Sequence, residues 1–234
     1  MDEDTSQLEP SRLGTKTHWD SVYSRELSNF IDTGDEGEIW FGEEVVEKMV
    51  NWALDHISPI SRPYILEIGA GNGTLLFALL EAGFESTRAV GIDYSADAVR
   101  LARAIAERRG LSGVLLLECN FLSQSPPKCS GQEQEWDLLL DKGTYDAIAL
   151  GEKDRQGISP AVGYPARAAA LLNPGGFFLI TSCNFTEDEL KQTFATPATG
   201  LLYHSRVSHP SIRFGGKTGS MYTTMAFQKP HLAP

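Results

Sequence analysis

The stretch I-L-E-I-G-A-G-N-G, residues 65–73, decides the fold of this chain of 234 residues. Its first half is apolar around one acid, Glu67, and its second half carries a glycine at every second position, directly before the helical run Thr74–Ala82. Glycine lets the backbone turn sharply and lets a ligand approach it closely, because no Cβ stands in the way. The stretch therefore predicts a buried strand, a ligand-binding loop and the start of a helix.

Two observations decide which cofactor this loop is predicted to bind. A nicotinamide loop of the G-x-G-x-x-G kind, counted from Gly69, requires a small residue where this chain has Thr74. The carboxylate of Glu67 would repel a pyrophosphate seated at the helix N-terminus, whereas it suits a cationic ligand. S-adenosylmethionine (SAM) carries a sulfonium and an ammonium, so we expect SAM. The loop residues predicted to bind it are Glu67, Gly69, Ala70, Gly71, Asn72 and Gly73.

The next predicted strand ends in an acid at the spacing that a nucleoside site needs. Asp93 closes the run Ala89–Asp93 and lies 22 residues after Gly71, where a carboxylate accepts ribose hydroxyls. Asp93 also fits the role of cap for the Arg-rich helix that starts near Ser95. Because Ser95 is itself a good N-cap, we expect Ser95 to cap this helix and Asp93 to bind ribose.

The apolar run at residues 114–118 predicts a third strand, which is followed by Asn120 and Phe121. An amide and a ring at that place could contact adenine, but Asn120 fits a simple turn equally well. The sequence leaves both roles open for Asn120. The predicted nucleoside contacts are Asp93, Tyr94, Asn120 and Phe121.

Strand and helix patterns alternate from residue 64 to residue 180, which is typical of an α/β fold with a parallel sheet. Further strands are expected at residues 136–141 and 177–182, with a helix at Ala161–Leu172 between them. Two last strands, at residues 201–207 and 221–228, leave no room for a helix between them and must pair antiparallel.

Composition bounds the class of protein. With 41% hydrophobic residues the chain can bury one sizeable core. It has no run of about 18 apolar residues and begins with acids, so we expect neither a membrane span nor a leader peptide. Its three cysteines are an odd number at unrelated spacings, which argues against a structural zinc or a disulfide framework. We expect a monomer in the cytoplasm, with the nucleus as a second compartment.

Acidic residues are concentrated at the N-terminus. Residues 1–50 hold 13 Asp and Glu against 4 Lys and Arg, a net charge of −9 out of −11 for the chain. A negative rim near a binding site suits a basic protein partner and repels a phosphate backbone, so direct nucleic-acid binding is not expected. A plain solubilising segment is the alternative.

The domain prediction follows from these patterns. Residues 1–13 are expected to be a disordered acidic tail, and residues 14–234 a single domain. Within it, residues 14–60 should form two helices and a lid, and residues 61–230 the SAM-binding core sheet. The lid is placed in the acidic run 34–47, because Trp40 and Phe41 are unusual in a solvated tail.

Several motifs make the chain resemble a known family. They are L-G-T-K-T-H-W-D-S-V-Y at 13–23, G-E-I-W-F-G-E-E at 37–44, G-I-D-Y-S at 91–95, D-K-G-T-Y-D-A-I at 141–148, G-F-F-L-I-T-S-C-N at 176–184 and F-G-G-K-T-G at 214–219. With the glycine loop, they closely resemble the protein-lysine methyltransferases that modify translation elongation factor 1-alpha. The resemblance implies a Rossmann-like class I fold with a mostly parallel seven-stranded sheet, an antiparallel C-terminal hairpin and helices on both faces. It also implies SAM as cofactor and elongation factor 1-alpha as protein substrate.

The resemblance also implies catalytic roles. Asp141 ends the fourth predicted strand and should face the same crevice as the glycine loop, where it would orient the substrate nitrogen or the SAM ammonium. Aromatic rings are candidate walls of a narrow lysine channel, because a cation can lie on a ring face, although they also fit a plain core. Lys142 is expected at the surface or rim. The predicted catalytic residues are Asp141, Tyr145, Trp40, Phe41 and Asn184.

Two rival functions share the SAM half of this prediction. A methyltransferase of bases in nucleic acids would carry an N-P-P-Y type signature, and D-K-G-T at residues 141–144 stands in that place. A methyltransferase of small molecules stays open. A non-catalytic interaction module that has kept the fold would show an eroded cofactor loop, whereas residues 69–73 and Asp93 are intact.

Overall fold

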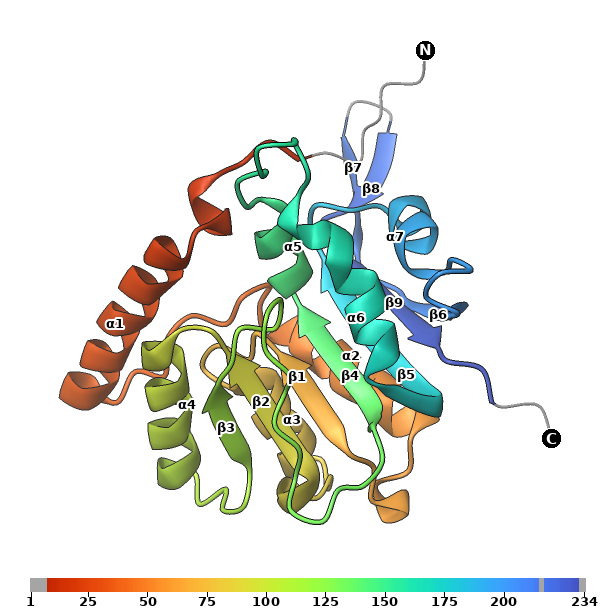
Figure 1. The fold of residues 1–234 in the computed structure, drawn as a ribbon. Coiled ribbons are helices and arrows are strands. Elements are labelled where there is room, and N and C mark those ends of the chain that lie inside the picture. The colour runs from red at the N-terminus through yellow and green to blue at the C-terminus, as the bar shows by residue number, and fades with distance from the viewer. Residues whose placement is uncertain (1–7, 215–216, 232–234) are drawn as a thin grey trace.

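The computed structural model describes residues 8–214 and 217–231, and its centre is a seven-stranded sheet (Figure 1). The strands of this sheet are β1 (Ile65–Ile68), β2 (Ala89–Asp93), β3 (Leu115–Glu118), β4 (Trp136–Lys142), β5 (Leu172–Ser182), β6 (Leu202–Val207) and β9 (Thr223–Gln228). They lie in the order β3-β2-β1-β4-β5-β9-β6. The first five are parallel, and β9 runs antiparallel to β5 and to β6. The predicted sheet, with its antiparallel C-terminal pair, is confirmed.

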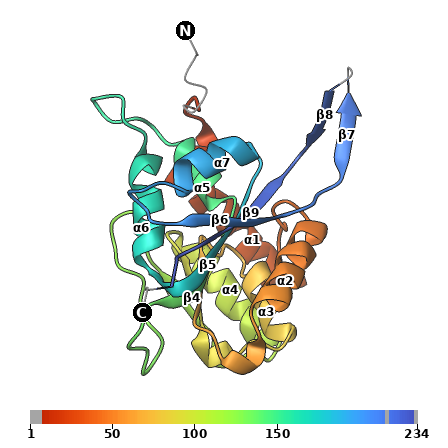
Figure 2. The same ribbon diagram turned by 90° about the vertical axis from the view of Figure 1, so that its right-hand side faces the viewer.

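Helices cover both faces of this sheet, as predicted. They are α1 (Lys16–Thr33), α2 (Glu43–His56), α3 (Thr74–Glu81), α4 (Ala96–Arg108), α5 (Thr144–Ala149), α6 (Tyr164–Ala170) and α7 (Glu187–Phe194), with short 3-10 turns at Arg12–Gly14, Pro59–Ser61, Ser86–Arg88 and Pro160–Gly163. Helices α2, α3 and α4 bury their apolar side chains in one core cluster, and α5, α6 and α7 bury theirs in another. Figure 2 shows the two groups on opposite sides of the sheet. Helix α1 packs along α4.

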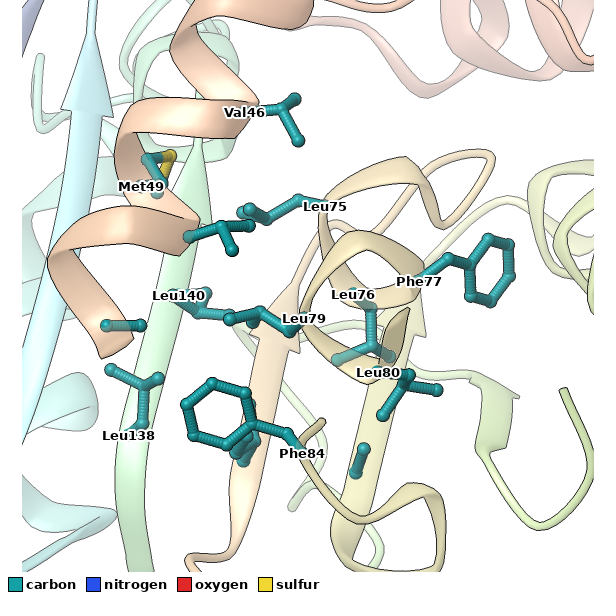
Figure 3. Close-up of a cluster of buried hydrophobic side chains, with 14 of the residues drawn as sticks. Val46, Met49, Leu75, Leu76, Phe77, Leu79, Leu80, Phe84, Leu138 and Leu140 are labelled. Atoms are coloured by element: carbon teal, nitrogen blue, oxygen red, sulfur yellow. The ribbon is translucent and has the colours of Figure 1, made fainter. Parts of the chain in front are cut away.

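Packing, more than helix propensity, holds the helix that follows the glycine loop (Figure 3). Helix α3 is only 8 residues long, too short to be stable alone in water. Its buried side chains pack against α2 and β4, and the fully buried members of this contact are Met49, Leu75, Leu76, Leu79, Leu138 and Leu140. Burying each contributes about 1.5–3 kcal/mol relative to leaving it exposed. The core therefore fixes the N-terminus of α3 at the loop.

Three elements differ from the sequence-based prediction. The expected helix at residues 161–172 is a 3-10 turn followed by the shorter α6. The N-P-G-G run at residues 173–176, expected to end that helix, lies inside β5, where the register against β4 shifts. Helix α5, inside D-K-G-T-Y-D-A-I, was not predicted, because six residues are too few for a helical period to be recognised.

A second, two-stranded sheet forms an arm outside the core. It consists of β7 (Ser211–Phe214) and β8 (Lys217–Ser220), paired antiparallel, and it projects from the body in Figure 2. The sequence predicted only a Gly-rich connection there. Residues 215–216 of the F-G-G-K-T-G motif lie outside the described residues.

The N-terminal residues are better ordered than expected where the structure describes them. Residues 1–7 of the predicted tail lie outside the described residues, but residues 8–13 do not form a disordered tail. The backbone N–H of Ser11 donates to the Leu150 carbonyl at 3.0 Å, and the Trp19 Nε1–H donates to the Leu13 carbonyl at 2.7 Å. No helix within the described residues is both long and apolar enough to span a membrane.

Candidate active site

A cavity of about 400 Å³ lies at the carboxyl ends of the parallel strands. Residues that follow each of the strands β1 to β5 line it, and ligands of open α/β sheets bind at this edge. On its other side it is covered by α1 and by the connection between α1 and α2, here called the strap (residues 34–42). Glu38, Trp40 and Phe41 of the strap line the cavity. That the strap acts as a lid stays a prediction.

The glycine loop lies on the cavity wall as predicted, with one exception. Residues 69–72 line the cavity, whereas Gly73 does not and instead caps α3 in the left-handed conformation, with φ of 83°. The loop is tied to the end of β2, because the Gly71 N–H donates to Asp93 Oδ2 at 3.0 Å and the Ala70 N–H donates to the Ile92 carbonyl at 2.9 Å. Cofactor contact by residues 69–72 stays a prediction.

Asn72 connects the glycine loop to the strap. Its Nδ2 donates to the carbonyls of Glu36 and Glu38 at 3.0 and 3.3 Å, and its Oδ1 accepts from the Thr74 hydroxyl at 2.8 Å. Glu26 of α1 holds the strap from the other side, since its Oε1 accepts the Glu38 N–H at 3.2 Å. The side chain of Asn72 therefore holds the strap against the glycine loop.

Asp93 lines the cavity, and its predicted contact with ribose stays a prediction, whereas the expected side-chain cap by Ser95 is wrong. The Ser95 hydroxyl makes no capping bond and has no hydrogen-bond partner among the described residues, whereas Asp93 Oδ1 accepts the Ser95 N–H at 2.9 Å. Asp93 thus orders both the loop and the turn before α4. Burial raises the pKa of this carboxyl to about 6. An ionised carboxylate accepts about four hydrogen bonds, so two acceptor positions are left for a ribose.

The predicted adenine end also lies on the cavity. Tyr94, Asn120 and Phe121 all line it. Asn120 makes the turn that the sequence allowed, because its Oδ1 accepts the Leu122 N–H at 3.0 Å, and its Nδ2 makes no hydrogen bond to a described residue. Phe121 is buried and packs on Tyr164, with 4.8 Å between ring centroids. Both roles considered for Asn120 are thus compatible with its place.

Glu67 does not line the cavity, so its predicted direct contact with a cationic ligand is not supported. It is 2% exposed, and its Oε2 accepts the Leu76 N–H in the first turn of α3 at 3.1 Å. Burial raises its pKa to about 8, against the attraction of the Lys142 ammonium. Glu67 therefore acts on the site through the position of α3.

Asp141 and Tyr145 do not line the cavity in this structure. The role predicted for Asp141, orienting the substrate nitrogen or the SAM ammonium, and that of Tyr145 as a channel wall stay predictions. Asp141 is fully buried and accepts the Thr144 N–H at 2.8 Å, the Tyr145 N–H at 3.0 Å and the Tyr164 hydroxyl. It therefore anchors the start of α5. Tyr145 packs in the core against Tyr164, Phe185 and Phe194, with ring centroids 5.0–5.2 Å apart.

Lys142 is partly exposed and lines the cavity, which is compatible with the expected place at the surface or rim. Its Nζ donates to the Trp40 carbonyl at 3.0 Å and lies 6.0 Å from the Phe41 ring centroid. Burial lowers its pKa, and the nearby carboxyls of Glu67 and Asp141 oppose that shift. Lys142 thereby holds the strap closed over the site.

Trp40 and Phe41 line the cavity, as a wall of the site requires. The Trp40 ring contacts Trp19 of α1 edge on, with 4.8 Å between centroids, and Phe41 packs on Tyr222 at 5.1 Å. The Trp40 Nε1–H is buried and has no acceptor among the described residues. A buried donor without a partner is unfavourable, so a ligand that offers an acceptor there would be stabilised.

The far half of the cavity, beyond β4 and β5, contains a residue that the sequence analysis did not single out. Asp146 of α5 lines the cavity together with Cys183 and the predicted Asn184. Asp146 is the second acid of the motif D-K-G-T-Y-D-A-I, but its position depends on α5. The first turn of this helix directs the Asp146 side chain toward the end of β5.

These features fit SAM along the cavity. The nucleoside end offers Asp93 for ribose hydroxyls and Asn120 with Phe121 for a base. The carboxyl groups of Asp93 and Asp146 in the wall suit a sulfonium and an ammonium. The unpaired Trp40 N–H suits an acceptor such as a carboxylate. The residues present are therefore those that a SAM site needs.

Fold and cavity together define a SAM-dependent methyltransferase. The methyltransferase domain family matches residues 62–225. The magnesium protoporphyrin IX methyltransferase of Synechocystis with bound SAM has a TM-score of 0.59 at 13% identity, over 89% of this chain and 97% of its own. The N-methyltransferase NodS of Bradyrhizobium japonicum with S-adenosylhomocysteine has a TM-score of 0.59 at 17% identity, over 91% and 99%. At these identities the structures support the fold alone.

Sequence similarity defines the family more closely. Protein-lysine N-methyltransferase efm4 of Schizosaccharomyces pombe is 44% identical over 236 residues, which cover 95% of this chain and 96% of the relative. EEF1A lysine methyltransferase 2 of Mus musculus is 41% identical over 94% of this chain and 85% of the relative, and EFM4 of Saccharomyces cerevisiae is 37% identical over 96% and 98%. The chain belongs to this family of protein-lysine N-methyltransferases.

Three buried acids predict that the ligand-free protein loses stability as the pH rises. Burial raises the pKa values of Asp93, Asp141 and Glu67 to about 6, 7 and 8, whereas unfolded Asp and Glu have pKa values of about 3.9 and 4.3. The folded state binds more protons between these limits, so unfolding becomes easier across that window. Urea denaturation should show a lower free energy of unfolding at about pH 8 than at about pH 5. Asp141→Asn should reduce the difference, and an equal slope in the variant would contradict this account.

Proposed function

We propose that this chain transfers a methyl group from SAM to a lysine side chain of translation elongation factor 1-alpha. The observation that carries this proposal is how far the similarity extends. Relatives named as protein-lysine or EEF1A lysine methyltransferases align with 94–96% of the chain, whereas the methyltransferase domain match begins only at residue 62. Helix α1 and the strap, which cover the cavity, are therefore part of the shared sequence. Substrate choice depends on such covering segments, because they shape the entrance.

The chemistry needs a neutral amine in line with the methyl group and little water. When bound, SAM supplies a methyl on a sulfonium, whose C–S bond breaks as the lone pair of the lysine Nζ forms the new N–C bond. Free lysine has a pKa of about 10.4, so its ammonium must first lose a proton. Transfer into a buried site lowers the pKa of an amine. We assign the rings of Trp40 and Phe41 two tasks: their faces attract the entering cation, and their bulk excludes water, which lowers the pKa of the amine.

Labelling in a cell lysate tests the proposed substrate without assuming it. The purified protein is incubated with methyl-labelled SAM and a lysate whose own methyltransferases have been heat-inactivated, and labelled bands are identified by mass spectrometry. We expect one dominant band, elongation factor 1-alpha, with the label on lysine. A dominant label on another protein, or on small molecules alone, would overturn this substrate.

The acidic face near the cavity is expected to receive a basic surface of the substrate protein, but the acids differ in their roles. Glu36 forms ion pairs with Arg108 and Arg109 of α4, and Glu44 pairs with Lys48 at 3.0 Å. Glu38 and Glu43 are exposed and have no ion-pair partner among the described residues. We therefore assign docking to Glu38 and Glu43, and a structural role to Glu36.

Reversing Glu38 and Glu43 to Lys is expected to raise KM for the protein substrate roughly threefold or more at low salt, because surface charges act through screened attraction. SAM affinity should change little, and the effect should shrink at high salt. The matched control reverses Asp55 and Glu107, which are exposed and do not line the cavity. Equal KM values for both variants would show that only net charge matters.

The cysteines support the proposed compartment. Cys119, Cys129 and Cys183 are all free thiols, which suits a reducing environment. We infer a cytoplasmic protein, with the nucleus as a second location, that acts as a monomer. Fractionation with a tagged full-length chain and light scattering of the purified protein test the two statements.

A further inference from the structure

Asp146 is the one buried carboxylate in the half of the cavity that lies beyond β4 and β5, among the described residues. Four carboxylate side chains line the cavity: Glu38, Asp93, Asp146 and Glu152. Glu38 and Glu152 are exposed. Asp93 lies at the nucleoside end, where its oxygens accept the N–H groups of Gly71 and Ser95. Asp146 is 4% exposed.

The surroundings of Asp146 hold its carboxylate in place without neutralising it. Its Oδ2 accepts the Cys183 N–H at 2.8 Å, and its Oδ1 accepts the Ser182 hydroxyl. No Lys or Arg forms an ion pair with it within the described part of the chain. The Cys183 thiol and the Asn184 N–H also interact with this carboxyl by hydrogen bonding. Burial raises its pKa, as expected for a carboxylate without a cation.

The topology of the sheet places Asp146 at the methyl-accepting end. The strand order runs β3-β2-β1-β4-β5, so a nucleoside held at β2 and β3 directs the rest of a cofactor across β1 toward β4. Asp146 follows β4, and the Cys183 and Asn184 that line the cavity beside it follow β5. The buried Asp146 carboxylate has no cationic partner in that place, and the ammonium of an incoming lysine would supply one.

We propose that Asp146 receives and orients the ammonium of the substrate lysine, with Ser182 and the Cys183 N–H as its positioning partners. The inference rests on the proposed lysine methylation. Asp146 binds the ammonium while it is charged and holds the nitrogen in place when its proton leaves to water at the mouth. The lone pair so freed is the one that forms the N–C bond. Asp141, which the sequence motif favoured, only supports α5 from behind.

Asp146→Asn is the primary test, because an amide can keep its carbonyl toward the Cys183 N–H and its NH₂ toward Ser182, whose hydroxyl can also accept. We expect kcat/KM for the protein substrate to fall at least about tenfold, the loss of a charge-assisted contact, with SAM affinity within about twofold of wild type. Asp146→Glu keeps the charge and should recover part of the activity. Unchanged kcat/KM in Asp146→Asn would overturn the proposal.

A double-mutant cycle separates recognition from stability. The second change replaces the methylated lysine of the substrate by Met. Binding of the Lys form and of the Met form of the substrate is measured for the wild-type enzyme and for Asp146→Asn. Wild type should bind the Met form at least about tenfold more weakly, and this difference should vanish in the variant. A difference retained in full would overturn the role of Asp146. If wild type methylates a protein other than elongation factor 1-alpha, the proposed substrate fails, and the same cycle on that protein still tests Asp146.

Discussion

Replacing Asp93 by Ala is expected to weaken SAM binding by about tenfold to a hundredfold, because charge-assisted hydrogen bonds contribute about 1.5–3 kcal/mol. The loss has two parts. The carboxylate would no longer accept the ribose hydroxyls, and the Gly71 and Ser95 N–H groups that it holds would lose their acceptor. Isothermal titration calorimetry with SAM and with S-adenosylhomocysteine measures the effect, and circular dichroism reports whether the fold is retained.

Ser95→Ala is the matched control for Asp93. A serine that capped α4 would cost about 1 kcal/mol of stability on replacement. Here the buried hydroxyl has no partner in the described residues, so the substitution should not lower stability and should leave SAM affinity unchanged. An Asp93→Ala variant that binds SAM within tenfold of wild type, or a Ser95→Ala variant that loses the stability of a cap, would contradict this arrangement.

Gly71→Ala should be among the most damaging small substitutions in the chain. Gly71 adopts φ of 56°, in the left-handed region, and an added Cβ would lie 2.4 Å from the Tyr23 hydroxyl of α1. The conformation costs about 1–2 kcal/mol, and overpacking adds about 1–3 kcal/mol. We expect a loss of about 2–5 kcal/mol in the free energy of unfolding, together with loss of SAM binding. Chemical denaturation and calorimetry measure the two effects.

Gly110 supplies the control for the backbone alone. Its φ is 69°, and an added Cβ would meet nothing within 4 Å, so Gly110→Ala should cost only about 1–2 kcal/mol. Combining Gly71→Ala with Tyr23→Phe removes the oxygen that the new Cβ would strike and should recover part of the stability. If Gly71→Ala and Gly110→Ala cost the same, the close approach of α1 to the loop is not a constraint.

The backbone of the cofactor half could be predicted because its signals are local. The glycine spacing at residues 69–73 and the acid that ends β2 appear on the cavity wall as expected, apart from Gly73 and Glu67. The antiparallel pairing of β6 with β9 followed from chain length alone. Trp40 and Phe41 were recognised because aromatic residues are unusual in an acidic, solvated segment and indicate a packed environment.

The roles within D-K-G-T-Y-D-A-I could not be predicted, because they depend on α5. A strand that ends at residue 141 would expose Asp141 to the crevice, but a helix that starts at Thr144 turns this carboxylate into an acceptor for its own first N–H groups. The same turn buries Tyr145 and brings Asp146 to the cavity. The contact of Lys142 with the strap could not be predicted for a related reason, since its partner, the Trp40 carbonyl, is 102 residues away in sequence.

Mass spectrometry of elongation factor 1-alpha after incubation with the purified chain and SAM tests the central claim most directly. The substrate should come from cells that lack this modification, and a variant with Asp93→Ala serves as the inactive control. We predict methyl groups on the Nζ of one specific lysine with the wild-type enzyme and a strongly reduced yield with the variant. Unmodified lysines after incubation with a wild-type enzyme that binds SAM in calorimetry would contradict the proposed function.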